Sequence, residues 1–374
     1  MSRPVAPVAP VAPVADEAIL LVGGLGTRLR PLTVHTPKPM LPVAGVPFVV
    51  HQLARLRDTG VRHVVLATSY RAEVFEGYLG DGARLGLEID YVTEETPLGT
   101  GGAIRNVAGR LRSGPDAPVV IMNGDVLSGH DVAAEVARHV SGDADVTLFL
   151  TRVPDPRAFG CVPTDSEGRV TAFLEKMPDP VTDQINAGCY VFRRSVVDAI
   201  APGVVVSVER DTFPALVSSG ATVLGYVEDG YWLDVGNPAA LVKASRDLVL
   251  GRLHSSVLPG AVGESLLLPG AVVAADARLA GGSVVGASAR VDPGAVVVGS
   301  VLLDGAHVGA GAVVRDSVVG VGAVVGPGTT MDDAVVGDGA AVGARCELRP
   351  GSRVWVDEVV PEGSVRTADH PLPS

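Results

Sequence analysis

The sequence predicts an α/β domain with a mostly parallel sheet, followed by a parallel β-helix. Short apolar segments alternate with segments of helical periodicity from residue 17 to residue 250. From residue 251 to residue 355 this periodicity disappears, and valine, glycine and alanine dominate. The length of 374 residues also exceeds what one hydrophobic core usually organises. These three observations together predict two domains of different architecture.

The first domain is expected to alternate strands and helices. Strands are predicted at 18–22, 63–69, 118–127 and 144–153. Helices are predicted at 47–60 and 72–82. Short buried strands separated by helices are typical of a Rossmann-like sheet with helices on both faces. Ligands bind beyond the carboxyl ends of strands in such sheets, so 23–30 and 123–125 are expected to face one site.

The second domain is predicted from an internal repeat. Residues 266–352 divide into five successive lines of 18, 17, 17, 17 and 18 residues, each with about three units of the type apolar-apolar-Gly-x-Gly-Ala. Three short strands joined by tight turns form one triangular coil of a parallel β-helix. Units of this form resemble the left-handed β-helix of hexapeptide-repeat proteins. The aromatic content of 4% agrees with so narrow a prism, which small apolar side chains fill.

The two ends of the chain fall outside these domains. Residues 1–16 repeat Val-Ala-Pro, which favours an extended polyproline coil over a signal-peptide helix, so we expect a disordered leader. Residues 356–374 are expected to form a C-terminal tail.

Composition excludes several classes of partner. The net charge is −12 and no cluster of Lys and Arg occurs, which argues against nucleic-acid and anionic-membrane partners. No apolar run reaches the roughly 18 residues that span a bilayer. Cys161, Cys189 and Cys346 are far apart, which predicts free thiols in a reducing cytoplasm rather than a disulfide or a metal cluster.

A glycine-rich turn, GGLGTRLR at 23–30, follows the first predicted strand. Backbone N–H groups at such a turn can approach phosphate oxygens. The turn is not a P-loop, because Thr-Arg stands where Lys-Ser/Thr is required, and it is not a dinucleotide fingerprint, because Leu29 occupies the last glycine position. The chain has three lysines, and one of them, Lys38, lies between two prolines shortly after this turn. The prolines stiffen the backbone around Lys38 and disfavour helix there.

The stretch GGLGTRLRPLT followed by PKP resembles the signature of the sugar-nucleotide pyrophosphorylases, which are nucleotidyltransferases. The resemblance covers roughly residues 18–355 and implies a nucleotidyltransferase domain over 17–250. It also implies that Arg28 and Lys38 neutralise the triphosphate and the departing pyrophosphate. The nucleotide-binding residues that it implies are Leu21, Gly23, Gly24, Gly26, Thr27, Glu94, Pro97, Gly99 and Gly124.

Two carboxylates stand out as metal ligands. Asp125 follows the strand VVIMNG, and Asp234 lies in GYWLDVGNP. Mg²⁺ prefers hard oxygen ligands and often takes one or two carboxylates together with substrate phosphates. The resemblance implies that Asp125 and Asp234 are this pair, with Mg²⁺ as the cofactor.

The segments FLEKMP and INAGCYVF are implied to hold the sugar 1-phosphate. In this interpretation Lys176 binds the phosphate as a catalytic group. The family usually has proline directly after this lysine, whereas this chain has Met177 at that position. The residues implied to surround the sugar phosphate are Gly160, Glu175, Lys176, Asn186 and Gly188. A sugar-phosphate oxygen would attack the α-phosphorus in line. Because the second pKa of a phosphate monoester is about 6, no general base is required.

Glu94, three residues before Pro97, bears on the choice of base. Guanine offers two adjacent N–H donors that a carboxylate can accept, whereas adenine offers an acceptor at N1. GTP is therefore the favoured nucleotide, with ATP, UTP and dTTP as alternatives. The glycines of PLGTGG (97–102) are expected to let the backbone lie close to the base. Overall similarity favours mannose 1-phosphate, with glucose or heptose 1-phosphate as competitors.

Two rival functions are less favoured. An acetyltransferase site in the β-helix would need a histidine and a loop that breaks the repeat, but His307 is the only histidine in the five lines and no line carries an insertion. A non-catalytic regulatory subunit would have lost some of the charged set, which is complete: Arg28, Lys38, Asp125, Lys176 and Asp234. The flat apolar sides of the β-helix predict a homo-oligomer.

Overall fold

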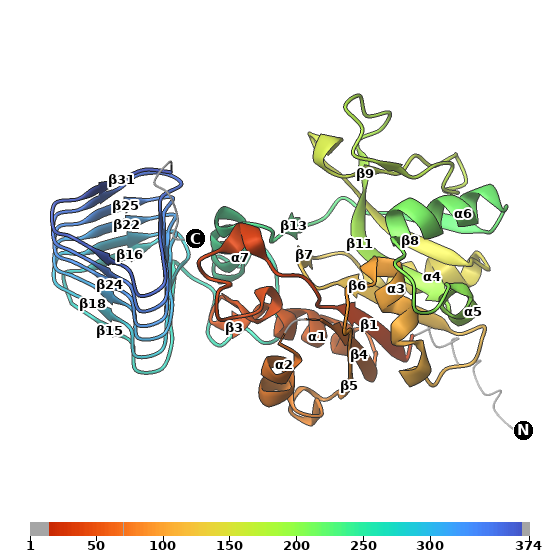
Figure 1. Cartoon of the computed structure of the whole chain (residues 1–374), viewed down its shortest axis with the longest axis horizontal. Coiled ribbons are helices and arrows are strands. Elements are labelled where there is room, and N and C mark those ends of the chain that lie inside the picture. The colour runs from red at the N-terminus through yellow and green to blue at the C-terminus, as the bar shows by residue number, and fades with distance from the viewer. Residues whose placement is uncertain (1–14, 70, 369–374) are drawn as a thin grey trace, which may run out of the picture.

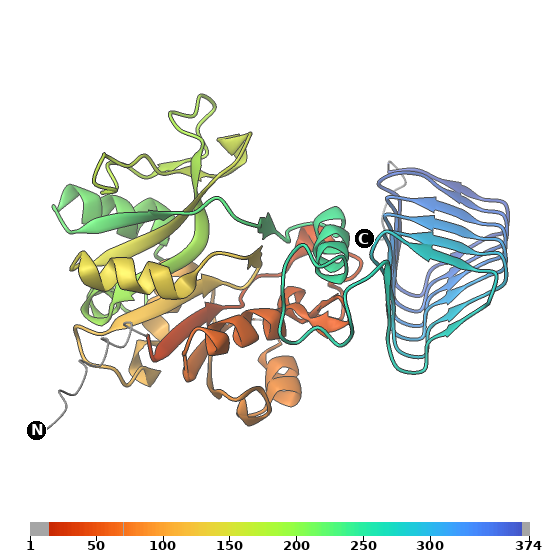
Figure 2. The same ribbon diagram turned by 180° about the vertical axis from the view of Figure 1, so that it is seen from behind.

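The computed structural model describes residues 15–69 and 71–368. An α/β domain and a β-helix lie end to end along the long axis, with helix α7 (Pro238–Val249) between them (Figures 1 and 2). Residues 1–14 of the expected leader and 369–374 of the expected tail lie outside the described residues. The arrangement of an α/β domain followed by a β-helix confirms the fold class predicted from the sequence.

The α/β domain is built on a mixed sheet of nine strands within the described chain. Its parallel part has the order β6-β1-β4-β5, and β11 joins it antiparallel to both β6 and β8. The strands are β1 (Glu17–Leu21), β4 (His63–Thr68), β5 (Glu88–Thr93), β6 (Pro118–Asn123), β8 (Val146–Arg152), β9 (Gly160–Cys161), β10 (Leu174–Glu175), β11 (Gln184–Arg193) and β12 (Val223–Val227). Two small antiparallel pairs are β2 (Pro42–Val43) with β3 (Val46–Pro47), and β7 (Val126–Ser128) with β13 (Trp232–Asp234).

Helices cover both faces of this sheet (Figure 1). The α-helices are α1 (Phe48–Asp58), α2 (Ala72–Leu79), α3 (Gly99–Asn106), α4 (Val132–Ser141), α5 (Arg194–Ala199), α6 (Phe213–Ser218) and α7. Single turns of 3₁₀ helix are η1 (Thr27–Leu29), η2 (Lys38–Met40), η3 (Ala83–Leu85), η4 (Ala108–Arg110) and η5 (Pro156–Ala158), and η6 (Val208–Thr212) is a π-helical turn. The helix predicted at 47–60 is α1, and the one predicted at 72–82 is α2.

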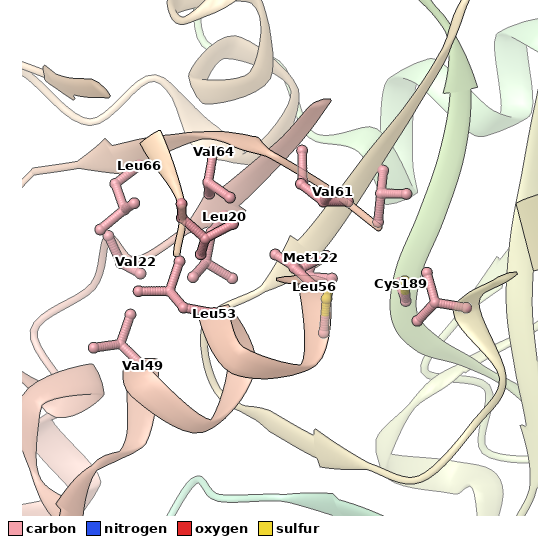
Figure 3. Close-up of a cluster of buried hydrophobic side chains, with 14 of the residues drawn as sticks. Leu20, Val22, Val49, Leu53, Leu56, Val61, Val64, Leu66, Met122 and Cys189 are labelled. Carbon is pink, nitrogen blue, oxygen red and sulfur yellow. The ribbon is translucent and has the colours of Figure 1, made fainter. Parts of the chain in front are cut away.

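The strands read as continuous apolar runs because both faces are buried. Successive side chains of β1 point to opposite faces, so Ile19 and Leu20 belong to different buried clusters. Figure 3 shows the cluster in which Leu20 packs against Leu53 of α1 and Leu66 of β4. Burying a leucine side chain stabilises the folded state by about 1.5–3 kcal/mol. The two clusters therefore hold the helices against the two faces of the sheet.

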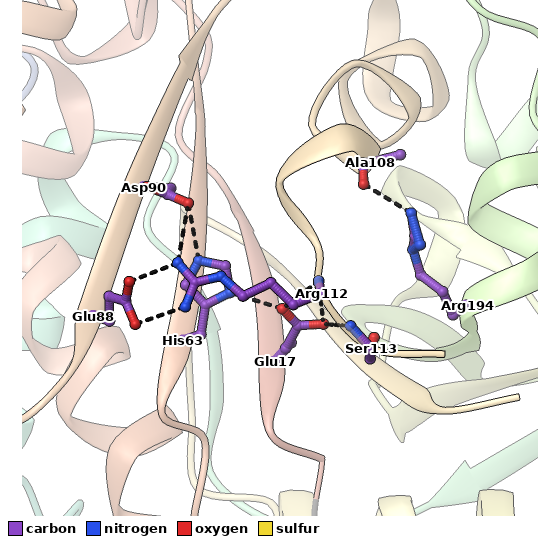
Figure 4. A network of polar contacts seen from close by, with 8 residues as sticks. All are labelled: Glu17, His63, Glu88, Asp90, Ala108, Arg112, Ser113 and Arg194. Carbon is purple, nitrogen blue, oxygen red and sulfur yellow. Dashed lines mark hydrogen bonds and ion pairs between the residues drawn. The ribbon is translucent and has the colours of Figure 1, made fainter. Parts of the chain in front are cut away.

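A polar network ties the amino-terminal edge of the same sheet (Figure 4). The carboxylate of Glu17, at the start of β1, accepts hydrogen bonds from the backbone N–H groups of Arg112 and Ser113. It also contacts Nδ1 of His63 at 2.8 Å. The guanidinium of Arg112 in turn bonds Glu88. This network lies at the opposite ends of the strands from the glycine-rich turn.

The second domain is a left-handed parallel β-helix, with three sheets of six strands each in the described chain. The first sheet comprises β14 (Ser265–Leu267), β17 (Ser283–Val285), β20 (Val301–Leu302), β23 (Val318–Val319), β26 (Val335–Val336) and β29 (Arg353–Val354). The second comprises β15 (Val272–Val273), β18 (Arg290–Val291), β21 (His307–Val308), β24 (Val324–Val325), β27 (Ala341–Val342) and β30 (Val359–Val360). The third comprises β16 (Arg278–Ala280), β19 (Val296–Val298), β22 (Val313–Arg315), β25 (Thr330–Asp332), β28 (Glu347–Leu348) and β31 (Val365–Arg366).

The β-helix extends further than the repeat in the sequence indicated. Strands β30 and β31 pair with the preceding coil, although the boundary was expected at residue 355 and the tail at 356–374. The last coil lacks the Gly-x-Gly-Ala units, but it keeps valine at the pairing positions Val359, Val360 and Val365. Strand pairing depends on backbone hydrogen bonds and an inward apolar side chain, so the coil forms without the glycine pattern.

The two domains share a buried apolar interface. Outward-facing residues of the first β-helix sheet, including Val301 and Val318, form one cluster with Leu29, Leu32 and α7 residues such as Leu248. The segment that follows the glycine-rich turn therefore rests directly on the β-helix.

Candidate active site

The carboxyl ends of β1 and β6 converge on the glycine-rich turn. The backbone N–H of Gly124 donates a hydrogen bond to the carbonyl oxygen of Leu21 at 2.7 Å. A Cβ at position 124 would lie 2.4 Å from that oxygen, so only glycine allows this approach. The approach brings the two segments predicted to face one site, 23–30 and 123–125, to one cavity of about 320 Å³.

This cavity is lined by cationic side chains and by the glycine-rich turn. The predicted residues along it are Leu21, Gly23, Gly24, Gly26, Thr27, Arg28, Lys38, Gly124 and Asp125. Lys38 begins the 3₁₀ turn η2, and its Nζ lies 2.8 Å from Oδ2 of Asp125. The guanidinium of Arg28 packs against Gly236 on the other side. Both cations thus face a space that glycine backbone leaves open, which suits a polyphosphate.

A small two-stranded sheet brings the two candidate metal ligands together. Strand β13 pairs with β7 so that Asp234 lies opposite Val126, and the N–H of Val235 donates to the carbonyl of Asp125 at 2.9 Å. Burial, followed by the charge of Asp125, raises the pKa of Asp234. Its Oδ1 is buried without a hydrogen-bond partner. An orphaned carboxylate oxygen beside a second carboxylate is a suitable pair of donors for a hard divalent cation.

A second cavity, of about 600 Å³, adjoins the first. The predicted residues along it are Gly160, Glu175, Lys176, Asn186, Gly188, Asp234, Arg28 and Asp125. Pairing of β9 with β10 sets Glu175 opposite Gly160. The pairing of β11 with β8 shifts register between Asn186 and Tyr190, and such a bulge re-aims side chains next to a site. Nδ2 of Asn186 donates to the hydroxyl of Tyr190 at 2.9 Å, which holds the amide at the cavity wall.

Lys176 extends from this wall in an uncommon backbone conformation. Its φ is 49°, in the left-handed region that a lysine rarely adopts. Its side chain is 61% exposed, and its Nζ lies 3.5 Å from Glu175. Residues before proline are biased toward extended conformations, so Met177 in place of the family's proline is compatible with this geometry. An exposed ion pair of this kind is weak, so the ammonium can turn toward an incoming phosphate.

A third cavity, of about 450 Å³, lies beyond the glycine-rich turn and is lined by Glu94, Pro97 and Gly99. Burial raises the pKa of Glu94, although the N–H of Leu98 donates to one of its oxygens. The other oxygen, Oε1, is buried without a partner. A half-buried carboxylate with an unpaired oxygen is suited to accept hydrogen bonds from a ligand.

The glycines of the 97–102 loop are required by a close packing contact that the sequence did not reveal. A Cβ at Gly99 would lie 2.6 Å from the carbonyl oxygen of Val206, and one at Gly101 would lie 2.7 Å from its Cγ1. The N–H of Gly101 also donates to that carbonyl at 2.8 Å. These glycines accommodate a distant segment of the same chain. Of the glycines at 99, 101 and 102, Gly99 alone lines the cavity, although all three were expected to let the backbone lie close to the base.

Sequence reasoning missed two residues that join the cavities. Thr100 lines the first and third cavities, and its hydroxyl donates to Oε2 of Glu209 at 2.9 Å. Glu209 lines the second cavity from the π-helical turn η6. Such turns are frequent at functional sites. Thr100 stands in the loop PLGTGG and Glu209 in the segment SVERD (207–211), and neither segment by itself indicates that the two residues would meet.

A buried cluster lies apart from this site. Ligand atoms of His130, Glu135 and Cys189 lie within 4.8 Å of one another. The guanidinium of Arg55 also bonds His130, and Nε2 of His130 lies 3.1 Å from Glu135. A cation there would face the positive charge of Arg55, so hydrogen bonding accounts for the cluster. Cys161, Cys189 and Cys346 are buried and free.

Comparison with known proteins identifies the family. A model described as nucleotidyl transferase matches residues 17–249. The chain belongs to the nucleotidyl transferase family. A second model, described as the GMPPB C-terminal domain, matches residues 261–365, which is most of the β-helix. No helix within 15–69 and 71–368 has the length and apolar character needed to cross a membrane.

Several relatives of this nucleotidyl transferase are named for one activity. A mannose-1-phosphate guanylyltransferase of Mycobacterium tuberculosis is 55% identical over 351 residues, which cover 94% of this chain and 97% of the relative. A mannose-1-phosphate guanylyltransferase catalytic subunit beta of Drosophila pseudoobscura pseudoobscura is 35% identical, covering 70% of this chain and 71% of the relative. The crystal structure of HddC from Yersinia pseudotuberculosis superimposes with a TM-score of 0.54 at 28% identity, covering 62% of this chain and 99% of that one.

Proposed function

We propose that this nucleotidyl transferase takes GTP and mannose 1-phosphate and releases GDP-mannose and pyrophosphate. The observation that carries the proposal is the convergence of Arg28, Lys38, Asp125 and Asp234 where the first two cavities meet. The names of the relatives from Mycobacterium tuberculosis and Drosophila support the choice of sugar and nucleotide.

The charges at this junction account for the chemistry. The attacking phosphate monoester is already largely a dianion at neutral pH, so the enzyme has to hold two anions in line rather than remove a proton. Arg28 lines both cavities and therefore faces both phosphates. Lys38 binds the triphosphate side, and Lys176 binds the phosphate of the sugar. Fixed cations at the place where the phosphates meet lower the barrier by electrostatic stabilisation.

Asp125 and Asp234 would hold Mg²⁺ as the cofactor. The unpartnered Oδ1 of Asp234 and the neighbouring carboxylate of Asp125 fit a hard cation. When bound, Mg²⁺ neutralises phosphate charge and acts as a Lewis acid. The carboxylate of Asp125 also anchors the position of Lys38 through their ion pair.

Glu94 is proposed to select guanine. Its carboxylate, in which Oε1 has no partner, can accept from the two adjacent N–H donors on guanine, and adenine presents an acceptor there instead. The HddC structure has also been determined as a complex with GMP-PN, which supports a guanine nucleotide in this fold. The alternative is the same chemistry with another pair: a glucose-1-phosphate adenylyl-, uridylyl- or thymidylyltransferase, or a heptose-1-phosphate guanylyltransferase.

A pyrophosphate-release panel tests the proposal. Each of ATP, GTP, CTP, UTP and dTTP is combined with mannose, glucose and heptose 1-phosphates in the presence of Mg²⁺. GTP with mannose 1-phosphate is expected to turn over fastest. A faster rate with another pair would overturn the substrate assignment, and no turnover with any pair would favour a non-catalytic regulatory subunit instead.

We also propose that the protein works as a homo-oligomer in the cytoplasm. One outward row of the second β-helix sheet holds the exposed valines Val272, Val324 and Val359. Arg290, His307 and Ala341 lie between them in the same row, so the proposed pairing surface is apolar only in part. The buried free thiols are compatible with a reducing compartment.

A further inference from the structure

The β-helix contacts the α/β domain through a row of apolar side chains, and an arginine stands at the end of this row. Parallel pairing places one residue of each coil in a single outward row of the first sheet. The first five members are buried and apolar: Leu266, Val284, Val301, Val318 and Val335. The sixth member is Arg353, which pairs with Val335. A charged side chain at the end of an otherwise apolar interface requires a specific partner.

That partner is the backbone of the glycine-rich turn. Nη1 of Arg353 donates a hydrogen bond to the carbonyl oxygen of Arg30, across 323 residues of sequence. Arg30 directly follows η1, and its own N–H closes that turn by bonding the carbonyl of Thr27 at 3.2 Å. Apolar packing also fixes this segment. Leu29 and Leu32 are buried in the same cluster as the five apolar residues of the row. The β-helix therefore contacts the segment around η1 through both apolar packing and a hydrogen bond.

The surroundings of Arg353 favour this bond. Burial lowers the pKa of Arg353, and the charge of Asp333 opposes that effect. A partly desolvated guanidinium makes stronger hydrogen bonds than an exposed one, because the local dielectric constant is lower.

The turn that Arg353 holds carries Arg28, which lines both the nucleotide and the sugar-phosphate cavities. We propose that Arg353 is a positioning residue, through which the β-helix fixes η1 and so aims the guanidinium of Arg28 at the phosphates. This inference rests on the proposed nucleotidyl transfer. Misplacement of a reacting constellation by about 1 Å can cost about 100-fold in rate, so a tether of this kind has a measurable effect.

The central test is Arg353→Val, which continues the apolar row, compared with Arg353→Lys, which keeps a donor. The matched control is Arg349→Val, because Arg349 is exposed and pairs with Glu347 on another face. Purified full-length proteins are assayed for pyrophosphate release with GTP and mannose 1-phosphate, and their Tm is measured. We expect kcat/KM for GTP to fall about tenfold in Arg353→Val. The Tm and the KM for the sugar phosphate should stay near wild type, and Arg353→Lys should recover much of the loss.

Hydrogen exchange gives a readout that does not depend on turnover. The amide protons of Arg30 and Leu32 are held by bonds within the turn, at 3.2 and 3.1 Å, and should exchange faster in Arg353→Val than in wild type or Arg349→Val. Unchanged kcat/KM together with unchanged exchange would overturn the inference. A loss of activity in both Arg353 variants that follows a matching loss of Tm would reduce Arg353 to a structural role. An inactive wild type would instead contradict the proposed function, while the exchange rates would still decide the role of Arg353.

Discussion

The Nζ of Lys38 lies 2.8 Å from Oδ2 of Asp125. The lysine between two prolines thus meets the carboxylate at the end of β6, although 87 residues separate them. Both groups line the cavity proposed for the triphosphate. A cation and a candidate metal ligand are therefore already paired at the place where phosphate charge would arrive, which keeps the charges of the site balanced before substrate binds.

The carboxylate pair should be needed for activity but costly for stability. We expect Asp234→Asn to lower kcat at least about 100-fold, because the metal ligand is lost. In EDTA the variant should melt at or above the wild-type Tm, since Oδ1 of Asp234 is buried without a partner. Added Mg²⁺ should raise the Tm of wild type only. A calorimetric series with EDTA and Mg²⁺ checks this, and a Mg²⁺ shift retained in the variant would contradict the metal assignment.

The three lysines offer an internal comparison for the sugar-phosphate site. Lys176→Ala should raise the KM for the sugar 1-phosphate about 30-fold or more, because a charge-assisted contact to phosphate is lost. The KM for GTP should change little. Lys243→Ala is the control, because Lys243 lies on α7, where it pairs with Asp247. Steady-state kinetics with each substrate varied decide the matter, and equal effects on both KM values would refute the assignment.

Glu94 should determine the choice of base. Glu94→Gln keeps the shape but removes the charge, and we expect the preference for GTP over ATP to fall about tenfold. Burial raises the pKa of Glu94 above its ordinary value of 4.5, so the preference should also fade as the pH falls through that raised pKa. Competition assays between the two nucleotides measure this. Glu76→Gln, an exposed change on α2, is the control, and unaltered discrimination in Glu94→Gln would exclude the carboxylate from base recognition.

The polar network at the far edge of the sheet should be a pH-dependent support of the fold. The pKa of Glu17 is lowered below 4.5 despite burial, because Ser113, His63 and Arg112 bond its carboxylate. Its stabilisation is therefore fully present above pH 4.5 and is lost as the pH falls through the lowered pKa. Glu17→Ala should destabilise the protein by about 2 kcal/mol at neutral pH. Exposed Glu88→Gln should cost far less in the same denaturant titration, and equal losses would contradict this account.

Self-association should depend on the second β-helix sheet. Light scattering at micromolar concentration is expected to give a mass that is a multiple of 38.2 kDa. Val324→Lys, at an exposed position of that sheet, should lower the mass, because the charge would be buried on pairing. Val205→Lys, exposed on the α/β domain, serves as the control. A monomer mass for the wild type would refute the proposal.

Much of the architecture could be read from local pattern. The apolar runs that became β1, β4, β6 and β8 are continuous because both faces of the sheet are covered. The 17- and 18-residue lines predicted the coils because each coil repeats the same backbone path. The last coil escaped detection because strand pairing there relies on Val359 and Val365 without the glycine units.

The candidate site was predicted residue by residue, and the resemblance also implied that Asp125 and Asp234 act as a pair. The strand pairing and the contacts that assemble the site were not predicted. The sequence by itself determined which groups carry charge and where glycine permits close approach, because these depend on side-chain chemistry and local backbone freedom. Only the tertiary structure decided that β13 would set Asp234 beside Asp125, that Thr100 would bond Glu209, and that Arg353 would hold Arg30. Such contacts join residues far apart in the chain. They arise when whole sheets and coils pack, and no local periodicity encodes which distant side chains will then meet.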